Sequence, residues 1–271
     1  MKITNIILAL LTLTMLLACG QKQPKENEKH DKSHSESTMT GIWLRMSPQG
    51  PVKMEFKKTG KVTIDFGNDQ AVEVSSNYTI NGDTVEFTDV EGEMCPAPGT
   101  YLMDETPYYL AFDVLNDTCN GRIKTTSGFW TKPNFRELQE TLDKQIAANP
   151  EAKLQLMRGR LYMATGNSEK ARKDFSAFIA KDSSNARVFI NRAATFFPGD
   201  MQSVLADCER AIALDPENKN AWFLRGLALY EMDRKKEACE SFSKAIELGF
   251  SVLRIAEKQK CAEYWDIENT P

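Results

Sequence analysis

Six cysteines and two histidines are the side chains whose types and spacing could do chemistry in this chain. A thiol can act as a nucleophile, form a disulfide or bind a metal, and an imidazole can activate a thiol or bind a metal. No two cysteines have CxxC spacing, and both histidines, His30 and His34, lie in a polar stretch. We therefore expect no catalytic cysteine, no metal site and no cofactor, because a hydrated linker explains the two histidines better.

The N-terminus has the three parts of an export signal. Lys2 supplies a positive charge, and residues 6–17 form an apolar run of twelve residues. About twenty apolar residues are needed to cross the ~30 Å hydrocarbon core of a bilayer, so this run fits a signal peptide better than a membrane span. Residues 16–20 read LLACG, which resembles the lipobox of bacterial lipoproteins. The resemblance implies that residues 1–18 are removed and that the thiol of Cys19 joins the lipid anchor, with acyl chains such as palmitate.

A polar segment separates this signal from the rest of the chain. Residues 20–40 contain almost no apolar side chains and cannot bury enough surface to offset the entropy of ordering. We expect residues 19–40 to form a lipidated, disordered tether. The formal net charge of −4 becomes −5 when Lys2 leaves with the signal, which argues against nucleic acid as a partner and leaves the lipid as the contact with a membrane.

An exported protein lies in an oxidising compartment, where cysteines pair. Five cysteines remain after the lipidated one. Cys95 and Cys119 share one segment and Cys239 and Cys261 share another, so we expect these two disulfides. Cys208 is left over at a core-facing position of an amphipathic helix, where a free thiol behaves as a small apolar side chain.

Residues 41–132 alternate between apolar and polar side chains with a period of two, which indicates β-strands. Strands are expected around residues 52–56, 62–66, 72–74, 78–80, 85–87, 108–115 and 122–130. Thr59-Gly60 and Asn81-Gly82 mark tight turns, and the second is a strong hairpin signal. Short strands about every ten residues predict an antiparallel meander that closes into a barrel or sandwich.

The start of this segment, Gly41-Ile42-Trp43, resembles the start of lipocalin-like domains, and residues 95–122 are similar to small lipocalin-like domains of bacterial lipoproteins. The resemblance implies a β barrel in which two cysteines hold a long loop to the next strand. Six aromatic side chains are candidates for its interior: Trp43, Phe56, Phe66, Phe87, Tyr109 and Trp130. They could line a ligand cavity, but a filled core is favoured because so short a domain leaves few residues to line one.

From residue 134 the apolar spacing changes to the 3.6-residue period of helices, and a repeat of about 34 residues emerges. Gly159, Ala193 and Gly226 recur at intervals of 34 and 33 residues, and each follows an arginine. These small residues let the two helices of a pair approach closely. The pattern resembles that of tetratricopeptide repeats, which residues 211–222 match closely. The resemblance implies helix pairs stacked into a solenoid, in which a terminal helix must shield the last apolar face.

The repeat register divides residues 134–271 into several parts. They are a half-repeat at 134–151, repeats at 152–185, 186–218 and 219–251, and a capping helix at 252–265. The middle repeat is one residue short. Arg158 and Arg192 recur together with Asp174 and Asp207 of the second helices, so we predict Arg–Asp pairs that brace the stack. The third repeat has Ser241 at the acidic position, which leaves its pair in doubt.

In tetratricopeptide arrays the first helix of each repeat lines the concave surface, and the register places ten candidate groove residues there. They are Leu156, Arg160, Met163, Arg187, Ile190, Phe197, Asn220, Phe223, Leu227 and Tyr230. The strip is apolar with basic residues toward its first end, and it suits an extended or helical peptide. The alternative is that this surface packs against the protein's own β domain or is only scaffold.

The sequence thus predicts an α+β chain of two domains, a small antiparallel β barrel or sandwich at 41–132 and an α-helical tetratricopeptide solenoid at 134–271. Neither domain contains a histidine or a recognised catalytic motif, so we expect no enzyme. The favoured function is a lipid-anchored scaffold of the bacterial envelope that binds another envelope protein or peptide. A carrier or sensor of a small apolar ligand, based on the β domain, is the alternative. Residues 20–21 after the cysteine lack the aspartate that retains some lipoproteins in the inner membrane, so we expect the outer membrane.

Overall fold

The computed structural model describes residues 39–90, 95, 97–250, 261, 262 and 264 of the 271-residue chain. All of them belong to one compact unit, Thr38–Pro271. The expected signal peptide, Cys19, both histidines, nearly all of the tether and most of the expected capping helix lie outside the described residues.

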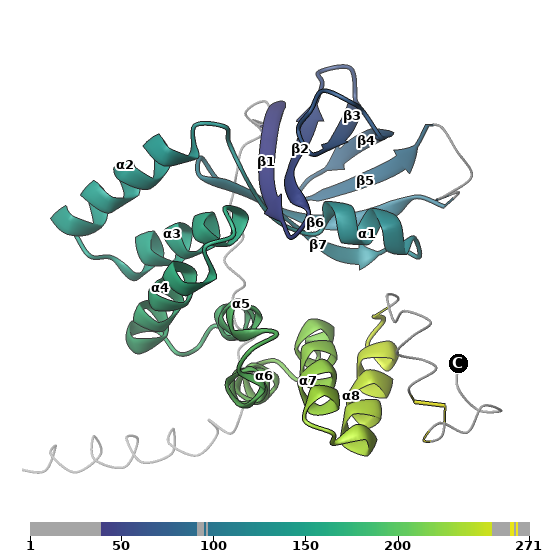
Figure 1. The fold of residues 1–271 in the computed structure, drawn as a ribbon, viewed down its shortest axis with the longest axis vertical. Coiled ribbons are helices and arrows are strands. Elements are labelled where there is room, and N and C mark those ends of the chain that lie inside the picture. The colour runs from purple at the N-terminus through teal and green to yellow at the C-terminus, as the bar shows by residue number, and fades with distance from the viewer. Residues whose placement is uncertain (1–38, 91–94, 96, 251–260, 263, 265–271) are drawn as a thin grey trace, which may run out of the picture. The chain divides into compact units, whose positions relative to one another are not determined.

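Eight antiparallel strands form a closed barrel in which each strand pairs with its neighbour along the chain and β8 also pairs with β1 (Figure 1). They are β1 Gly41–Ser47, β2 Gly50–Phe56, β3 Lys61–Phe66, β4 Val74–Asn81, β5 Thr84–Asp89, β6 Gly99–Glu105, β7 Tyr109–Asn116 and β8 Gly128–Thr131. Both predicted turns are present, with Gly60 at φ 78° and Gly82 at φ 65°. Glycine suits these positions because side chains with a Cβ rarely adopt positive φ. The barrel predicted from alternation is confirmed.

Large apolar side chains fill the barrel interior. Trp43, Trp130, Tyr101, Phe56 and Phe112 are each less than 2% exposed. The rings are in mutual contact, as in the edge-to-face pair of Phe87 and Phe112 at 5.6 Å. Each indole N–H is satisfied by a backbone carbonyl, that of Met39 for Trp43 and that of Thr126 for Trp130.

Two of the six predicted interior aromatics lie elsewhere, which corrects the prediction. Phe66 is 41% exposed. It ends β3 beside a loop in which Asp65 accepts hydrogen bonds from the backbone N–H groups of Asp69 and Gln70. Tyr109 is buried, but on the outer side of β7 against the helical region rather than in the barrel core.

The segment predicted as a strand at 122–130 is instead a short helix, α1 Asn120–Thr126, followed by β8. The helix buries Arg122, Ile123 and Thr126 on one side. The Arg122 guanidinium donates to both carboxylate oxygens of Asp117, at 2.7 and 2.9 Å. A buried arginine needs such a partner, and Asp117, which precedes the first turn of α1, supplies it.

The remaining described elements are helices. They are α2 Phe135–Ala148, α3 Ala152–Ala164, α4 Ser168–Lys181, α5 Ala186–Phe196, α6 Met201–Leu214, α7 Lys219–Glu231 and α8 Lys235–Glu247. Asparagine or aspartate side chains cap the N-termini of α4 to α7, where they accept backbone N–H groups that have no partner within the helix. Helix α5 is the short one, because Pro198 disfavours helical backbone just before it.

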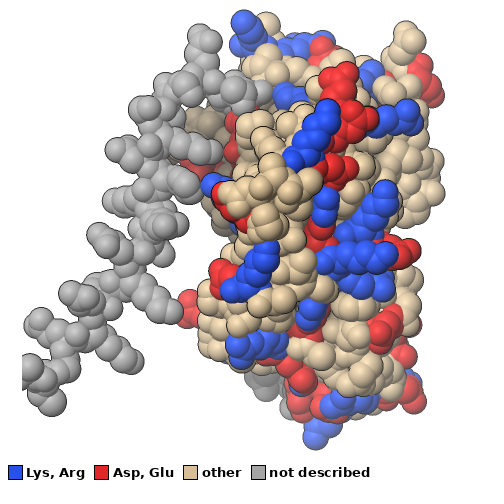
Figure 2. All heavy atoms as spheres, turned by 90° about the vertical axis from the view of Figure 1, so that its left-hand side faces the viewer, with Lys and Arg blue, Asp and Glu red and all other residues tan. Residues whose placement is uncertain are grey.

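Among the described residues, no helix is both long enough and apolar enough to cross a membrane. The same part of the chain holds no group of three His, Cys, Asp or Glu side chains suited to a metal ion. In Figure 2, acidic and basic side chains lie intermixed over the face that it shows.

Candidate functional site

The helices stack as pairs, and three arginines brace the second helices of neighbouring pairs. Arg158 of α3 donates to both oxygens of Asp174 in α4, at 2.8 and 2.6 Å. It also donates to Asp143 of the preceding helix α2, at 2.7 Å. The guanidinium fork of Arg158 is thus matched to the carboxylate of Asp174, the strong form of this contact. The predicted pair Arg158–Asp174 is confirmed.

The brace recurs in the next pairs. Arg192 of α5 donates to both oxygens of Asp207 in α6, at 2.8 and 2.6 Å, which confirms the second predicted pair. It also reaches Ser176 of α4, at 3.2 Å. Arg225 of α7 donates to Ser241 of α8 at 2.6 Å and lies 3.6 Å from Glu209 of α6. Each arginine therefore joins the second helix of its own pair to that of the pair before.

In each pair, the side chain that one helix turns toward the other is smaller where the facing side chain is larger. A Cβ added to Gly159 would lie 2.7 Å from the ring of Phe175, and one added to Gly226 would overlap the ring of Phe242. Ala193 and Cys208 occupy the corresponding positions in the middle pair and are fully buried. Where the first helix carries the methyl group of Ala193 instead of a glycine, the second helix carries the small Cys208 side chain instead of a phenylalanine.

This packing explains the unpaired cysteine. Cys208 is buried as a free thiol, as its position in the helical pattern indicates. Burial raises its pKa to about 12, so the thiolate that would react is not formed at neutral pH. The other described cysteines form the disulfides Cys95–Cys119 and Cys239–Cys261, each with a Cα–Cα distance of 5.5 Å.

The structure divides the ten candidate groove residues into two groups. Leu156, Arg160 and Met163 lie on α3, Arg187 and Ile190 lie on α5, Phe197 follows α5, and Asn220, Phe223, Leu227 and Tyr230 lie on α7. The basic end of this strip contacts the barrel, since α3 packs on β1, β7 and β8. At the aromatic end, Lys219 at the start of α7 donates a hydrogen bond to the Leu115 carbonyl of β7, at 3.2 Å.

Arg160 makes the main polar contact between α3 and the barrel. Its guanidinium pairs with the carboxylate of Asp104 at 2.8 Å, donates to the hydroxyl of Tyr109, and lies over the rings of Tyr109 and Phe129. The Tyr109 hydroxyl in turn donates to Asp104 at 3.0 Å. Burial raises the pKa of Tyr109 to about 12, so the hydroxyl stays protonated and can donate.

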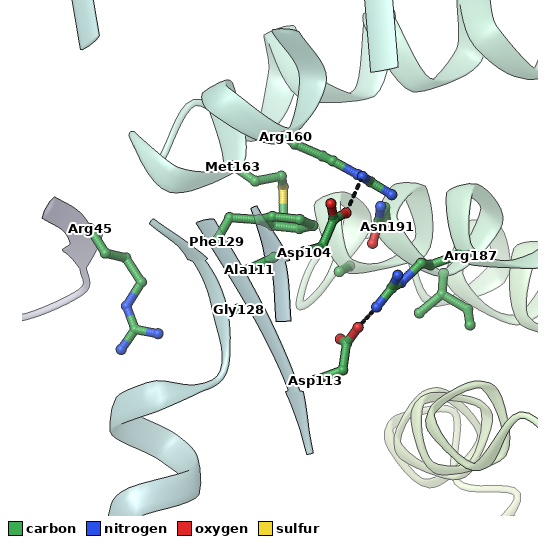
Figure 3. A pocket seen from close by; sticks show the side chains of 12 residues that line it. Arg45, Asp104, Ala111, Asp113, Gly128, Phe129, Arg160, Met163, Arg187 and Asn191 are labelled. Carbon is green, nitrogen blue, oxygen red and sulfur yellow. Dashed lines mark hydrogen bonds and ion pairs between the residues drawn. The ribbon is translucent and has the colours of Figure 1, made fainter. Parts of the chain in front are cut away.

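A second ion pair and a pocket lie beside this contact. Arg187 of α5 pairs with Asp113 of β7. Figure 3 shows Arg160 and Arg187 reaching from the helices toward the two barrel aspartates. A pocket of about 330 Å³ lies between α3, α5 and the barrel. The basic end of the predicted groove is thus engaged by the protein's own barrel, as the alternative reading of the sequence allows.

The partners on the barrel side were missed from the sequence. Asp104, Asp113 and Phe129 carry no motif. One signal was present in β7, where Tyr109, Leu110, Ala111 and Phe112 are buried in succession. In a strand with one face in water, buried and exposed side chains alternate. A run of four buried side chains therefore indicates that other elements pack on both faces of the strand.

The aromatic end of the strip lies on α7 and at the end of α5. Phe197 is 36% exposed. Phe223 stacks on Phe250 with centroids 4.3 Å apart and contacts the ring of Phe242 at 5.8 Å. Asn220, Leu227 and Tyr230 are partly exposed. This end is therefore apolar and partly exposed, although the ring of Phe223 is packed within the repeats.

Paired helices stacked beside a closed barrel define a helical repeat array fused to a β domain. A family model described as Tetratricopeptide repeat matches residues 138–197 and 205–249, which fall on α2 to α5 and on α6 to α8. The C-terminal helices are therefore tetratricopeptide repeats. Arrays of this kind use their extended concave surfaces to bind other proteins.

The chain is also similar to individual proteins that contain such repeats. It is 24% identical over 152 residues to the mitochondrial import receptor subunit TOM70 of Homo sapiens, a match that covers 51% of this chain and 25% of that protein. The chain thus spans a quarter of the length of this curated relative. Among solved structures, MamA is 22% identical with a TM-score of 0.44, covering 53% of this chain and 81% of that one. The Sgt2 TPR domain from Aspergillus fumigatus is 28% identical with a TM-score of 0.37, covering 42% and 77%.

Proposed function

We propose that this protein is a lipid-anchored, non-catalytic protein-binding module of the bacterial cell envelope. The observation that carries the proposal is the aromatic end of the repeat groove, where Phe197 is 36% exposed beside partly exposed side chains of α7. Aromatic anchors supply a large share of the energy at protein interfaces. The partner is another envelope protein or a peptide segment of one.

The barrel limits where this partner binds. Arg160 and Arg187 are already paired with Asp104 and Asp113. A peptide that bound there would have to separate these ion pairs. The binding surface is therefore the α5–α7 portion, which consists of Phe197, Asn220, Phe223, Leu227 and Tyr230.

A carrier of an apolar ligand inside the barrel is not favoured. The barrel axis is occupied by the packed aromatic core, including Trp43, Phe56 and Trp130 at no more than 1% exposure. An apolar ligand could enter only by displacing these side chains.

Replacing Tyr230 with alanine should weaken partner binding about thirtyfold, the loss expected for an interface anchor worth ~2 kcal/mol. The full chain, immobilised, would capture the partner from detergent-solubilised envelopes of the producing bacterium. The amount recovered by wild type and variant is compared by quantitative mass spectrometry.

Phe66→Ala is the control, because this aromatic ring is 41% exposed but lies on the barrel, outside the repeats. It should leave recovery unchanged. If wild type and Tyr230→Ala recovered the same amount of partner, or if Phe66→Ala lost as much as Tyr230→Ala, the groove would not be the binding surface.

The anchor rests on residues 16–20, whose pattern resembles a lipobox, and we place the protein at the outer membrane. Cys19→Ser should move the chain from the detergent phase to the aqueous phase on phase partitioning, because two or three acyl chains are what hold such a protein at a bilayer. Cys208→Ala should stay in the detergent phase. Retention of Cys19→Ser in that phase would show that lipidation at this residue is not the anchor.

A further inference from the structure

The pocket between the barrel and the repeat array is lined by residues of both. Strand residues of the barrel form one side, and α3 and α5 form the other (Figure 3). Its volume of about 330 Å³ is far more than one or two ordered waters fill. It lies at the small end of the ~300–1,000 Å³ range of small-molecule sites.

Two buried nitrogen donors in the pocket lining have no hydrogen-bond partner in the described part of the chain. They are Nε of Arg160 and Nδ2 of Asn191. Arg160 is 7% exposed, and its Nη1 is the atom that engages Asp104 and Tyr109. Both residues line the same pocket, Arg160 from α3 and Asn191 from α5 (Figure 3). Buried donors are almost always paired in folded proteins, so an acceptor from outside the chain is called for.

The charge of the lining shows which kind of acceptor fits. Three arginines, Arg45, Arg160 and Arg187, line the pocket together with two carboxylates, Asp104 and Asp113. The Arg45 guanidinium donates to the backbone carbonyls of Thr125 and Ser127, whereas Arg160 and Arg187 pair with the two aspartates. Burial lowers the pKa of Arg45 to about 10, which still leaves it charged at neutral pH. The lining therefore carries an excess of one positive charge, which a monoanion would neutralise.

The rest of the lining is apolar. Ala111 and Phe129 of the barrel face Met163, Ile190 and Ala194 of the helices. A ligand that fills this space needs a short hydrocarbon part as well as its charged group.

We propose that this pocket binds a small aliphatic carboxylate, independently of the peptide groove. One carboxylate oxygen accepts the Nε–H of Arg160 and the other accepts from the amide of Asn191, while the hydrocarbon part lies against Phe129 and Met163. The pocket is a site separate from the barrel interior, and its failure would leave the proposed protein-binding function untouched.

The test is a titration of the ¹⁵N-labelled full chain with sodium hexanoate, followed by NMR. Saturable shifts are expected in the side-chain amide of Asn191 and in the Arg160 Nε–H signal. Hexanamide, which has the same chain without the charge, should bind at least tenfold more weakly. Absence of saturable shifts at these two groups overturns the proposal and leaves a pocket that holds only water. Equal binding of hexanamide would overturn the assignment of an anion.

Two variants with matched controls complete the test. Asn191→Leu should weaken hexanoate binding about tenfold through the lost hydrogen bond, whereas Gln202→Leu on α6 should not. Ala194→Trp should fill the pocket from its exposed rim and abolish binding, whereas Ala213→Trp, exposed on α6, should not. Because the rim position tolerates bulk, Ala194→Trp remains informative even if Asn191→Leu perturbs the fold. Hexanoate binding unchanged by Ala194→Trp contradicts the site.

Discussion

Replacing Gly226 with alanine should lower the free energy of unfolding of the repeat region by about 2–3 kcal/mol, at the upper end of the cost of overpacking. The added Cβ would overlap the ring of Phe242 and lie 3.1 Å from its Cζ. Phe242 is fully buried in the core cluster of the repeats, so its ring can move only by displacing neighbouring side chains. Urea unfolding followed by circular dichroism at 222 nm measures the change. Helix propensity alone predicts the opposite sign, a gain of about 1 kcal/mol.

Gly199→Ala is the control, because this glycine lies in an exposed turn where an added Cβ meets only the Phe196 carbonyl oxygen, at 3.4 Å. Its effect should stay within about 0.5 kcal/mol. A Gly226→Ala variant as stable as wild type would show that the two helices can separate at little cost.

The middle pair allows the same rule to be tested by exchange. Cys208→Phe should destabilise the array, since the new ring meets the methyl group of Ala193. The double variant Ala193→Gly with Cys208→Phe recreates the arrangement of Gly226 and Phe242, and it should recover at least ~1 kcal/mol relative to the sum of the single changes. Strict additivity of the two changes would contradict size matching.

Arg192→Met should destabilise the repeat region by about 2 kcal/mol. The change leaves the carboxylate of Asp207, whose side chain is 6% exposed, without its guanidinium partner. Breaking a fully buried pair costs ~3–5 kcal/mol, but the Arg192 side chain is 22% exposed, so solvent reduces the loss. The midpoint of urea unfolding is the measurement.

The control for the arginine is Lys173→Met, which removes an ion pair to Glu169 whose two side chains are each 74% exposed. Such surface pairs contribute at most ~1 kcal/mol, so the midpoint should barely move. Adding Asp207→Leu to Arg192→Met should restore part of the stability, because no buried charge is then left unpaired. If Arg192→Met unfolds at the wild-type midpoint, the Arg192–Asp207 pair contributes nothing measurable to the free energy of unfolding.

Local patterns predicted most of the fold. Alternation in β2 placed Val52, Met54 and Phe56 on one buried face, and the structure has them there. The 3.6-residue period and the recurring arginines gave the helix pairs and two of the braces. The pattern failed at α1, where the one apolar residue, Ile123, gives no clear period. Arg122 of this helix pairs with Asp117. The spacing of apolar residues cannot predict such a pairing between polar side chains.

The candidate site was predicted only in part, because some of its contacts join residues that lie far apart in the chain. The repeat register identifies residues such as Arg160 and Phe223 because it depends on neighbours within one helix. The partner of Arg160 is Asp104, 56 residues earlier in the chain and on another domain. Contacts over such separations are set by how two folded surfaces meet, and no local spacing encodes them. The pocket beside them was unpredictable for the same reason.

The arginine brace also bears on how this chain could grow or shrink in evolution. Its acceptors lie at equivalent points of successive second helices, Asp143, Ser176 and Glu209, which are 33 residues apart. A duplicated unit of that length would bring along both an arginine and the acceptors for its neighbours. The first two repeats cannot be exchanged in this way, since Arg160 and Arg187 tie them to the barrel. We therefore expect repeats to be gained or lost beyond these two, while the junction with the barrel stays fixed.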